Sequence, residues 1–291
     1  MSETFEWIDA DGASLTISGP GITTYAVEMP ASGRYMPKIR TQSDGVPGQP
    51  GGRWRRSDHD VRDFVLPLAV AGTSEANLRA LLRDLMYRMD PTRGQGRIRV
   101  TSPAGDQREI TCLYAAGLEG DEKEESTGLQ FQSFPLAMTA YDPYWYDVSP
   151  TSETFTTSAV AVFFPIFQLR LTASQLVVDD SVTNAGDVDA WPVWTITGPG
   201  SSIKLTNLTT SQSIYFPSLT LGNDETITVD TRPNIKSVLL GDGTNMYPYL
   251  DSSSFLWALR RGGNAIRLEM TGADYTSTSL TISFYQRWLS P

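Results

Sequence analysis

Hydrophobic and polar positions alternate in several stretches of the first half of the chain, which is the period of a β-strand. The first 29 residues contain two such stretches, "ASLTISG" and "TTYAVEM", with "GPG" between them, and this predicts a hairpin. Alternation returns in "FVLPLAVAG", in a second hairpin about "SPAGD", and in "LQFQSFPLAMTAYD". The pattern therefore predicts a sheet-forming first half.

One segment has the period of a helix instead. In residues 74–89 the apolar residues follow the i, i+3, i+4, i+7 spacing: Leu78, Leu81, Leu82, Leu85, Met86 and Met89. Thr73 or Ser74 can cap the helix, and the Asp90-Pro91 pair should end it. We expect the stripe, including both leucines at its middle (Leu81 and Leu85), to be buried against the sheet.

Residues 30–60 differ in kind from their surroundings. Glycine and proline recur there, the hydrophobic period vanishes, and Arg53 and Arg55 flank Trp54. The sequence predicts a long loop, and loops of this length are usually functional or disordered. We expect it to become ordered only against a partner, since it lacks apolar surface to offset the entropy of ordering.

From residue 151 onward no helical period occurs. Short strands alternate with turn signals such as "NAGD", "TGPG" and "GDGTN", which predicts a β-sandwich. We place a domain boundary near residues 147–160, giving domains at 1–150 and 151–291. The predicted fold class is mainly β, with one α-helix in the first domain.

Composition narrows the function. The chain has 291 residues and a formal net charge of −10, which disfavours binding to phosphate backbones. Its one cysteine, Cys112, excludes an intrachain disulfide and is expected to be a small buried thiol. The polar, acidic start has no signal-peptide pattern, and no apolar run approaches the length of a membrane span. Folding in a cytoplasm, away from membranes, is the simplest expectation.

Catalytic and metal-binding motifs are scarce. The one histidine, His59, is not accompanied by a nucleophile elbow of the G-x-S-x-G kind. A chain with one histidine and one cysteine cannot form the usual zinc sites. No phosphate-binding glycine loop occurs. "DDSVTNAGDVD" and "GDGTN" could offer calcium oxygen ligands or could simply form turns. We expect no enzyme activity, no cofactor and no metal.

The stretch "YDPYWYDVSP", residues 141–150, crowds aromatics, carboxylates and prolines together. Carboxylates beside aromatics can grip sugars, and Asp142 with Asp147 could be imagined as a glycosidase pair. The prolines stiffen the segment at the predicted end of a domain, so a packed joint is the favoured interpretation.

The order of these motifs resembles a known family. The Leu-rich helix, Asp-Pro, the hairpin ending in "LYAAGLEG" and then "DPYWY" resemble the ring-forming domain of siphophage distal tail (Dit) proteins. The segment "NAGDVDAWPVWTITGPG" resembles that family's C-terminal galectin-like β-sandwich. The resemblance covers roughly residues 60–291, and implies a β-barrel-like first domain followed by the galectin-like sandwich.

The resemblance implies a structural virion protein at the phage tail tip, assembled in the cytoplasm of the bacterial host. Six copies would form a ring between the tail tube and the tip hub proteins, and DNA would cross its channel without specific binding. The resemblance implies that Tyr144 and Trp145 pack against a neighbour. Residues 30–60 match no pattern of the family, and from their own composition we expect Arg53, Trp54 and Arg55 to contact neighbouring copies or the tail tube.

The charged run "DEKEES", residues 121–126, is the densest acidic segment. Its carboxylates Glu122, Glu124 and Glu125 could face the channel and repel phosphate, or could lie on an outer rim. Both positions stay open.

The alternative function is a carbohydrate-binding module for host cell-wall glycan. Trp191, Trp194 and Trp257 would then form an exposed stacking platform. Trp191 and Trp194 are three positions apart and so lie on opposite faces of a regular strand, which also allows them to be core residues.

Overall fold

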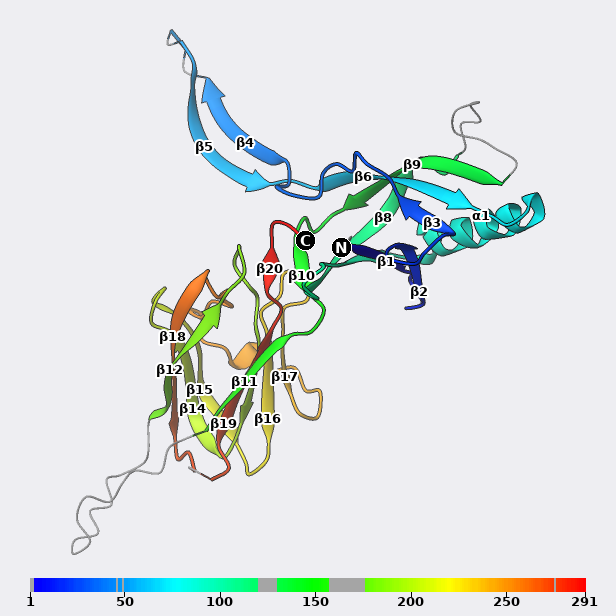
Figure 1. Ribbon diagram of the computed structural model, residues 1–291. Coiled ribbons are helices and arrows are strands. Elements are labelled where there is room, and N and C mark those ends of the chain that lie inside the picture. The colour runs from blue at the N-terminus through cyan, green and yellow to red at the C-terminus, as the bar shows by residue number, and fades with distance from the viewer. Residues whose placement is uncertain (1–2, 46, 49, 120–129, 157–175, 275) are drawn as a thin grey trace, which may run out of the picture. The chain divides into compact units, whose positions relative to one another are not determined.

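The computed structural model describes residues 3–45, 47–48, 50–119, 130–156, 176–274 and 276–291 (Figure 1). The chain forms two compact units. Unit 1 comprises Met1–Val148 and Trp288–Pro291, and unit 2 comprises Ser149–Arg287. Residues 288–291, which the sequence analysis placed in the second domain, thus return to the first unit. Among the described residues, no helix has the length and apolar character needed to cross a membrane.

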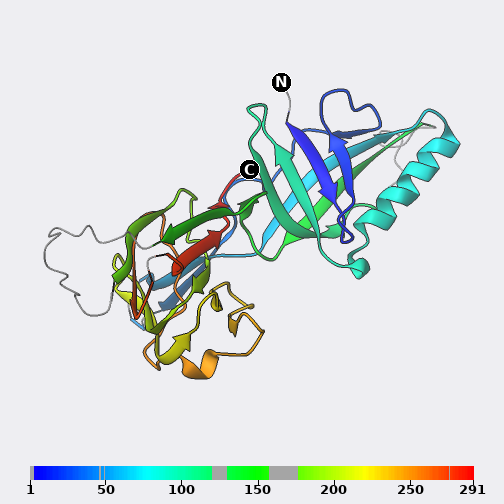
Figure 2. The same ribbon diagram turned by 90° about the horizontal axis from the view of Figure 1, so that it is seen from below.

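Unit 1 is built on one antiparallel sheet with the strand order β2-β1-β7-β8-β9-β6-β3. Its strands are β1 (Thr4–Ile8), β2 (Ser14–Ser18), β3 (Tyr25–Val27), β6 (Arg62–Ala71), β7 (Gly96–Thr101), β8 (Gln107–Ala116) and β9 (Phe131–Ala140). The short strands β10 (Trp145–Asp147) and β20 (Arg287–Trp288) pair with each other, and β10 pairs with β8. Figure 2 shows the sheet curling, with the helix along one side. Strand β6 alternates buried residues with half-buried or exposed ones, as its sequence predicted.

Helix α1 (Glu75–Met89) confirms the predicted helix. The Ser74 hydroxyl caps it by accepting a hydrogen bond from the Asn77 N–H at 3.2 Å. Leu78, Leu85 and Met89 are buried, but Leu81 is only half-buried and Met86 is 42 % exposed. The prediction that Leu81 is buried was therefore wrong, because only the narrow helix face that carries Leu78, Leu85 and Met89 is covered by the core. A 3-10 turn, η1 (Pro91–Arg93), follows.

The prediction that residues 30–60 form a long loop missed the strands within this segment. The segment contains an antiparallel hairpin of β4 (Ile39–Gly45) and β5 (Gly52–His59). Every residue of β4 is exposed, as are the first six of β5. With neither face buried, alternation is not required, so the hairpin left no hydrophobic period in the sequence. We call residues 39–59 the arm.

Unit 2 confirms the predicted β-sandwich. The strands of one sheet are β11 (Thr151–Thr156), β19 (Ser279–Phe284), β13 (Val193–Thr197), β16 (Thr226–Asp230) and β17 (Ser237–Leu240), in that order. Those of the other are β12 (Leu176–Asn184), β18 (Gly262–Thr271), β14 (Gly200–Asn207) and β15 (Gln212–Leu221). Buried residues of both sheets form one core, and a 3-10 turn, η2 (Tyr247–Tyr249), lies between β17 and β18. The predicted mainly β fold class is confirmed for the chain.

Candidate assembly surfaces

The arm carries an exposed aromatic residue beside an arginine. Trp54 is 66 % exposed, and its indole N–H donates to the Ser57 hydroxyl at 2.9 Å. The neighbouring Arg55 forms an ion pair with Asp44 across the hairpin. Arg53 makes no ion pair with any residue that the structure describes. Of the three arm residues expected to contact a partner, Arg53 and Trp54 are thus free to do so.

The segment that leads into the arm is apolar and exposed. Met29, Tyr35, Met36 and Ile39 are 73, 68, 57 and 47 % exposed. Gly33 anchors the segment against β6, since a Cβ there would lie 2.3 Å from the Asp63 carbonyl oxygen and φ is +79°. Soluble monomers seldom expose so many large apolar side chains close together, so this segment is a candidate interface.

A buried arginine fastens the base of the arm. Arg62, only 1 % exposed, begins β6. Its guanidinium donates to five backbone carbonyls, those of Gly33 at 3.1 Å, Arg34 at 2.8 Å, Pro143 at 2.7 Å, Leu289 at 3.0 Å and Tyr35. Burial lowers the pKa of Arg62 to about 10, which leaves it charged at neutral pH. One side chain therefore joins three separate segments of unit 1.

The aromatic cluster before the unit boundary packs inside unit 1. Trp145 is 1 % exposed, and its indole N–H donates to the Arg34 carbonyl at 3.1 Å. Its expected role as a partner contact was therefore wrong, because the core already encloses the ring. Tyr144 is half-buried, and its hydroxyl lies 2.7 Å from Nδ1 of His59, at the end of β5. The cluster joins the arm to the sheet within unit 1, whereas the joint expected from the sequence was one between the two domains.

Residues 288–291, which we call the latch, are held by side chains of three strands of unit 1. The Trp288 indole N–H donates to Oδ1 of Asp147 at 2.7 Å. The Arg108 guanidinium carbon lies 4.0 Å from the centre of the Trp288 ring, and Nη1 donates to the Ser290 carbonyl at 2.8 Å. Arg62 holds Leu289 in the same way. No local pattern in the sequence marks these four residues as part of unit 1.

The latch predicts a pH dependence. Burial raises the pKa of Asp147, while the bond from Trp288 and the charge of Arg108 partly oppose the shift. A carboxyl with a raised folded-state pKa binds its proton more tightly when folded. The stabilisation that protonated Asp147 gives the folded state is complete below the unfolded pKa of about 3.9. This stabilisation is lost as pH rises through the folded pKa.

The variant Asp147→Asn keeps the acceptor oxygen for Trp288 and cannot ionise. The stability of the native protein relative to this variant should therefore fall as pH rises from about 3.5, near the ordinary aspartate pKa, to neutrality. Paired urea titrations at both pH values would measure it, with all other carboxyls common to both proteins. A difference that is constant, or that grows with pH, would contradict the prediction.

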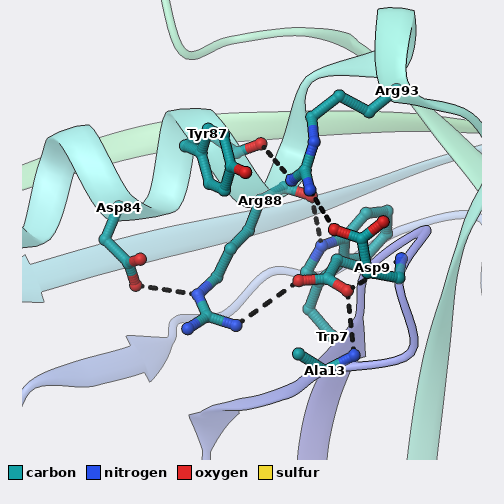
Figure 3. Close-up of polar contacts among 8 residues, drawn as sticks. Trp7, Asp9, Ala13, Asp84, Tyr87, Arg88 and Arg93 are labelled. Atoms are coloured by element: carbon teal, nitrogen blue, oxygen red, sulfur yellow. Dashed lines mark hydrogen bonds and ion pairs between the residues drawn. The ribbon is translucent and has the colours of Figure 1, made fainter.

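A polar network fixes the C-terminal end of α1 to the turn after β1 (Figure 3). Arg88 donates to Asp84 at 2.8 Å and contacts the buried Asp9 at 3.4 Å. The Trp7 indole N–H donates to the Arg88 carbonyl at 2.9 Å. Asp9 in turn accepts from the Ala13 N–H at 2.9 Å, so the helix end and the turn are rigidly connected.

Arg93, just beyond the helix, extends this network (Figure 3). It forms an ion pair with Asp11 and donates to the Tyr87 carbonyl at 3.1 Å. Its guanidinium carbon lies 3.9 Å from the centre of the Tyr87 ring. This cation is thus already engaged within its own unit.

The tryptophan platform for glycan is not present in unit 2. Trp194 and Trp257 are 0 and 2 % exposed, and their rings pack edge to face at 4.9 Å between centres. The alternation of β13 turns Trp194 into the core. Trp191 is half-buried, so no stack of exposed rings forms from these three residues.

The Asn/Asp-rich segment after β12 forms a turn. The buried Asn184 amide donates to the carbonyls of Val188 at 2.9 Å and Leu259 at 3.1 Å, and its oxygen accepts from the Gly186 N–H. Over the residues that the structure describes, no group of three or more His, Cys, Asp or Glu side chains is placed to hold a metal ion. Turn formation accounts for this motif.

Two other expectations concern charge and reactivity. Glu122, Glu124 and Glu125 lie outside the described residues, so their channel-facing position stays a prediction. Cys112 is buried, and burial raises the pKa of its thiol to about 12, which makes it unreactive at neutral pH.

Comparison with known proteins agrees with the motif order. Residues 185–288 match the family model of the siphovirus-type tail component, C-terminal domain. No curated protein sequence matches the chain. Among solved structures, the Dit protein of phage SPP1, described as a paradigm of the hub adsorption apparatus in phages infecting Gram-positive bacteria, is similar. It has 15 % identity and a TM-score of 0.68 over 99 % of each chain.

A chain of the phage P2 baseplate, in its activated conformation with calcium, is also similar. It shows 12 % identity and a TM-score of 0.50, over 97 % of this chain and 98 % of that one. The resemblance to Dit proteins is thus confirmed, by the family model over most of unit 2 and by the fold over the whole chain. The chain thus has a fold similar to that of Dit proteins, and its residues 185–288 match the C-terminal domain of a siphovirus-type tail component.

Proposed function

We propose that the protein is a structural component that assembles into a ring of six copies at the tail tip. The ring joins the tail tube to the tip hub and leaves a channel through which DNA passes. It is assembled in the host cytoplasm and performs no chemical step. The observation that carries the proposal is the arm, together with the exposed apolar segment at its base.

The arm is poorly suited to exist uncovered. A lone two-stranded hairpin is at best marginally stable in water, and this one buries neither face. The neighbouring Met29, Tyr35 and Met36 expose apolar area that contact with another surface would remove from water. A partner surface would supply what the arm lacks.

Copies of the same chain can supply that surface. A projecting element that docks on a different face of the next copy makes a heterologous contact, and such contacts close into rings when the rotation between copies allows it. The Dit-like fold supports this partner over an unrelated one. Contacts with tail-tube and hub proteins would use the two faces of the ring.

Passage of DNA is consistent with the charge of the chain. A net charge of −10 gives phosphate little to bind, although the repulsion is screened beyond about 8 Å at physiological salt. Such a surface would let nucleic acid slide past without being held.

The proposal predicts self-association that depends on Trp54. The native protein should form a closed oligomer at micromolar concentration, and Trp54→Ala should weaken association by about 30-fold or more, since buried interface aromatics commonly contribute about 2 kcal/mol. Sedimentation velocity over a concentration series would measure both. Phe255→Ala removes a similarly exposed aromatic residue, 62 % exposed on unit 2, and should leave association unchanged. A native protein that stays monomeric throughout would contradict the ring.

A further inference from the structure

A groove lies at the C-terminal end of α1, with a volume of about 470 Å³. It is lined by Met86, Tyr87, Met89, Asp90, Pro91, Tyr114, Leu118 and Glu119. Five of these eight side chains are large and apolar or aromatic, and Met86 and Tyr87 are 42 and 60 % exposed. We call this the helix-end groove.

Both walls of the groove are preformed. The helix wall is held by the network of Trp7, Asp9 and Arg88 (Figure 3). On the opposite wall the Leu118 N–H donates to the Tyr114 hydroxyl at 2.9 Å, and the Gly117 N–H to Oε2 of Glu119 at 2.6 Å. A groove whose walls are already hydrogen-bonded requires little ordering when it is filled, which favours binding.

The rim of the groove is acidic. A hydrogen bond from the backbone of Thr92 keeps the pKa of Asp90 below its usual value, and backbone N–H groups do the same for the pKa of Glu119. Both are therefore carboxylates at neutral pH, and neither forms an ion pair with any described residue. Arg93, whose charge also lowers the pKa of Asp90, forms its ion pair with Asp11.

The arm has the complementary chemistry. Near its tip it presents Trp54, 66 % exposed, beside Arg53, a cation without an ion pair among the described residues. In Figure 1 the arm and α1 lie at opposite ends of unit 1. A basic, aromatic projection at one end and an acidic, apolar groove at the other are what head-to-tail contact between identical copies requires.

We infer that the arm of one copy docks in the helix-end groove of the next copy, with Trp54 against the apolar lining and Arg53 beside Glu119. This inference rests on the proposed ring and adds the surface that receives the arm. It makes each copy both donor and acceptor of one contact.

Cysteine crosslinking tests the pairing. Arg53→Cys and Glu119→Cys should form a disulfide between copies under mild oxidation, and the buried thiol of Cys112 should not compete. The doubly substituted chain should give a ladder of covalent oligomers up to the size of the ring. A mixture of the two singly substituted chains should stop at covalent dimers, because each copy then carries only one reactive end.

The matched control places the second cysteine elsewhere on unit 1. Asp106 is another exposed carboxylate, in the turn after β7 and away from the groove lining, and Arg53→Cys with Asp106→Cys should give no ladder. Charge exchange gives a second measurement: Arg53→Glu and Glu119→Lys should each weaken association, and the double exchange should restore most of it.

The outcomes separate the two proposals. Oligomers that form in sedimentation but crosslink no better through residue 119 than through residue 106 would overturn the groove and leave the ring standing. Association that is unaffected by both charge reversals would overturn it as well. A native protein that remains monomeric would overturn the ring and the groove together.

Discussion

Replacing Leu85 by alanine is expected to lower the free energy of unfolding of unit 1 by about 2–5 kcal/mol. Leu85 is 0 % exposed and belongs to the core of unit 1. The truncation removes apolar contact and leaves a cavity that neighbouring strands can only partly fill. A urea titration, with hydrogen exchange identifying the transition of unit 1, would measure the loss.

Met86→Ala is the matched control on the same helix. Met86 follows Leu85 directly but is 42 % exposed, and both substitutions introduce alanine, so helix propensity changes little. Its cost should stay below about 1 kcal/mol. Equal losses for the two variants would show that the core does not enclose Leu85 as described.

The variant Arg62→Met should lower the free energy of unfolding by about 3 kcal/mol or more. It keeps an unbranched side chain of similar length but removes every donor to five carbonyls, and a buried polar group left without its partner costs about 1–3 kcal/mol. Arg62→Lys, which keeps the charge but not the planar fork of donors, should recover only part of the loss.

Arg40→Met is the control for the loss of an arginine. Arg40 is 58 % exposed at its side chain, and its contact with Asp60 spans 3.9 Å, so its removal should cost less than about 1 kcal/mol. Hydrogen exchange should also accelerate in residues 288–291 of Arg62→Met and not of Arg40→Met. A loss below 1 kcal/mol for Arg62→Met would show that its bonds are replaced by water.

Local patterns in the sequence were sufficient for elements whose side chains meet a core. Helix α1 was predicted from its spacing, its Ser74 cap and its Asp90-Pro91 stop, because each of these acts within a few residues. The alternation of β6 and β13 likewise follows from one face being buried. The order of motifs also indicated the resemblance to Dit proteins that the fold comparison bears out.

Features that depend on distant residues could not be predicted in this way. The arm has no buried face and so no hydrophobic period, although its glycines and prolines, and the arginines beside Trp54, marked the segment as unusual. The resemblance suggested that Trp145 is a contact residue. Its indole instead packs in the core and donates to the carbonyl of Arg34, which lies 111 positions away and which no local pattern connects to it. The helix-end groove combines the end of α1 with Leu118 and Glu119, which no local spacing connects.

The latch has a consequence for biosynthesis. Residues 288–291 leave the ribosome after all of unit 2, yet they fill places in unit 1 beside Asp147, Arg108 and Arg62. During translation the packing of unit 1 therefore cannot be completed until all of unit 2 has been synthesised. Until then the Arg62 guanidinium lacks one of its carbonyl acceptors, that of Leu289. A chain interrupted within unit 2 would carry an incomplete first unit. Because its first unit is incomplete, such a fragment should be incorporated poorly into an assembly and so should not disrupt it.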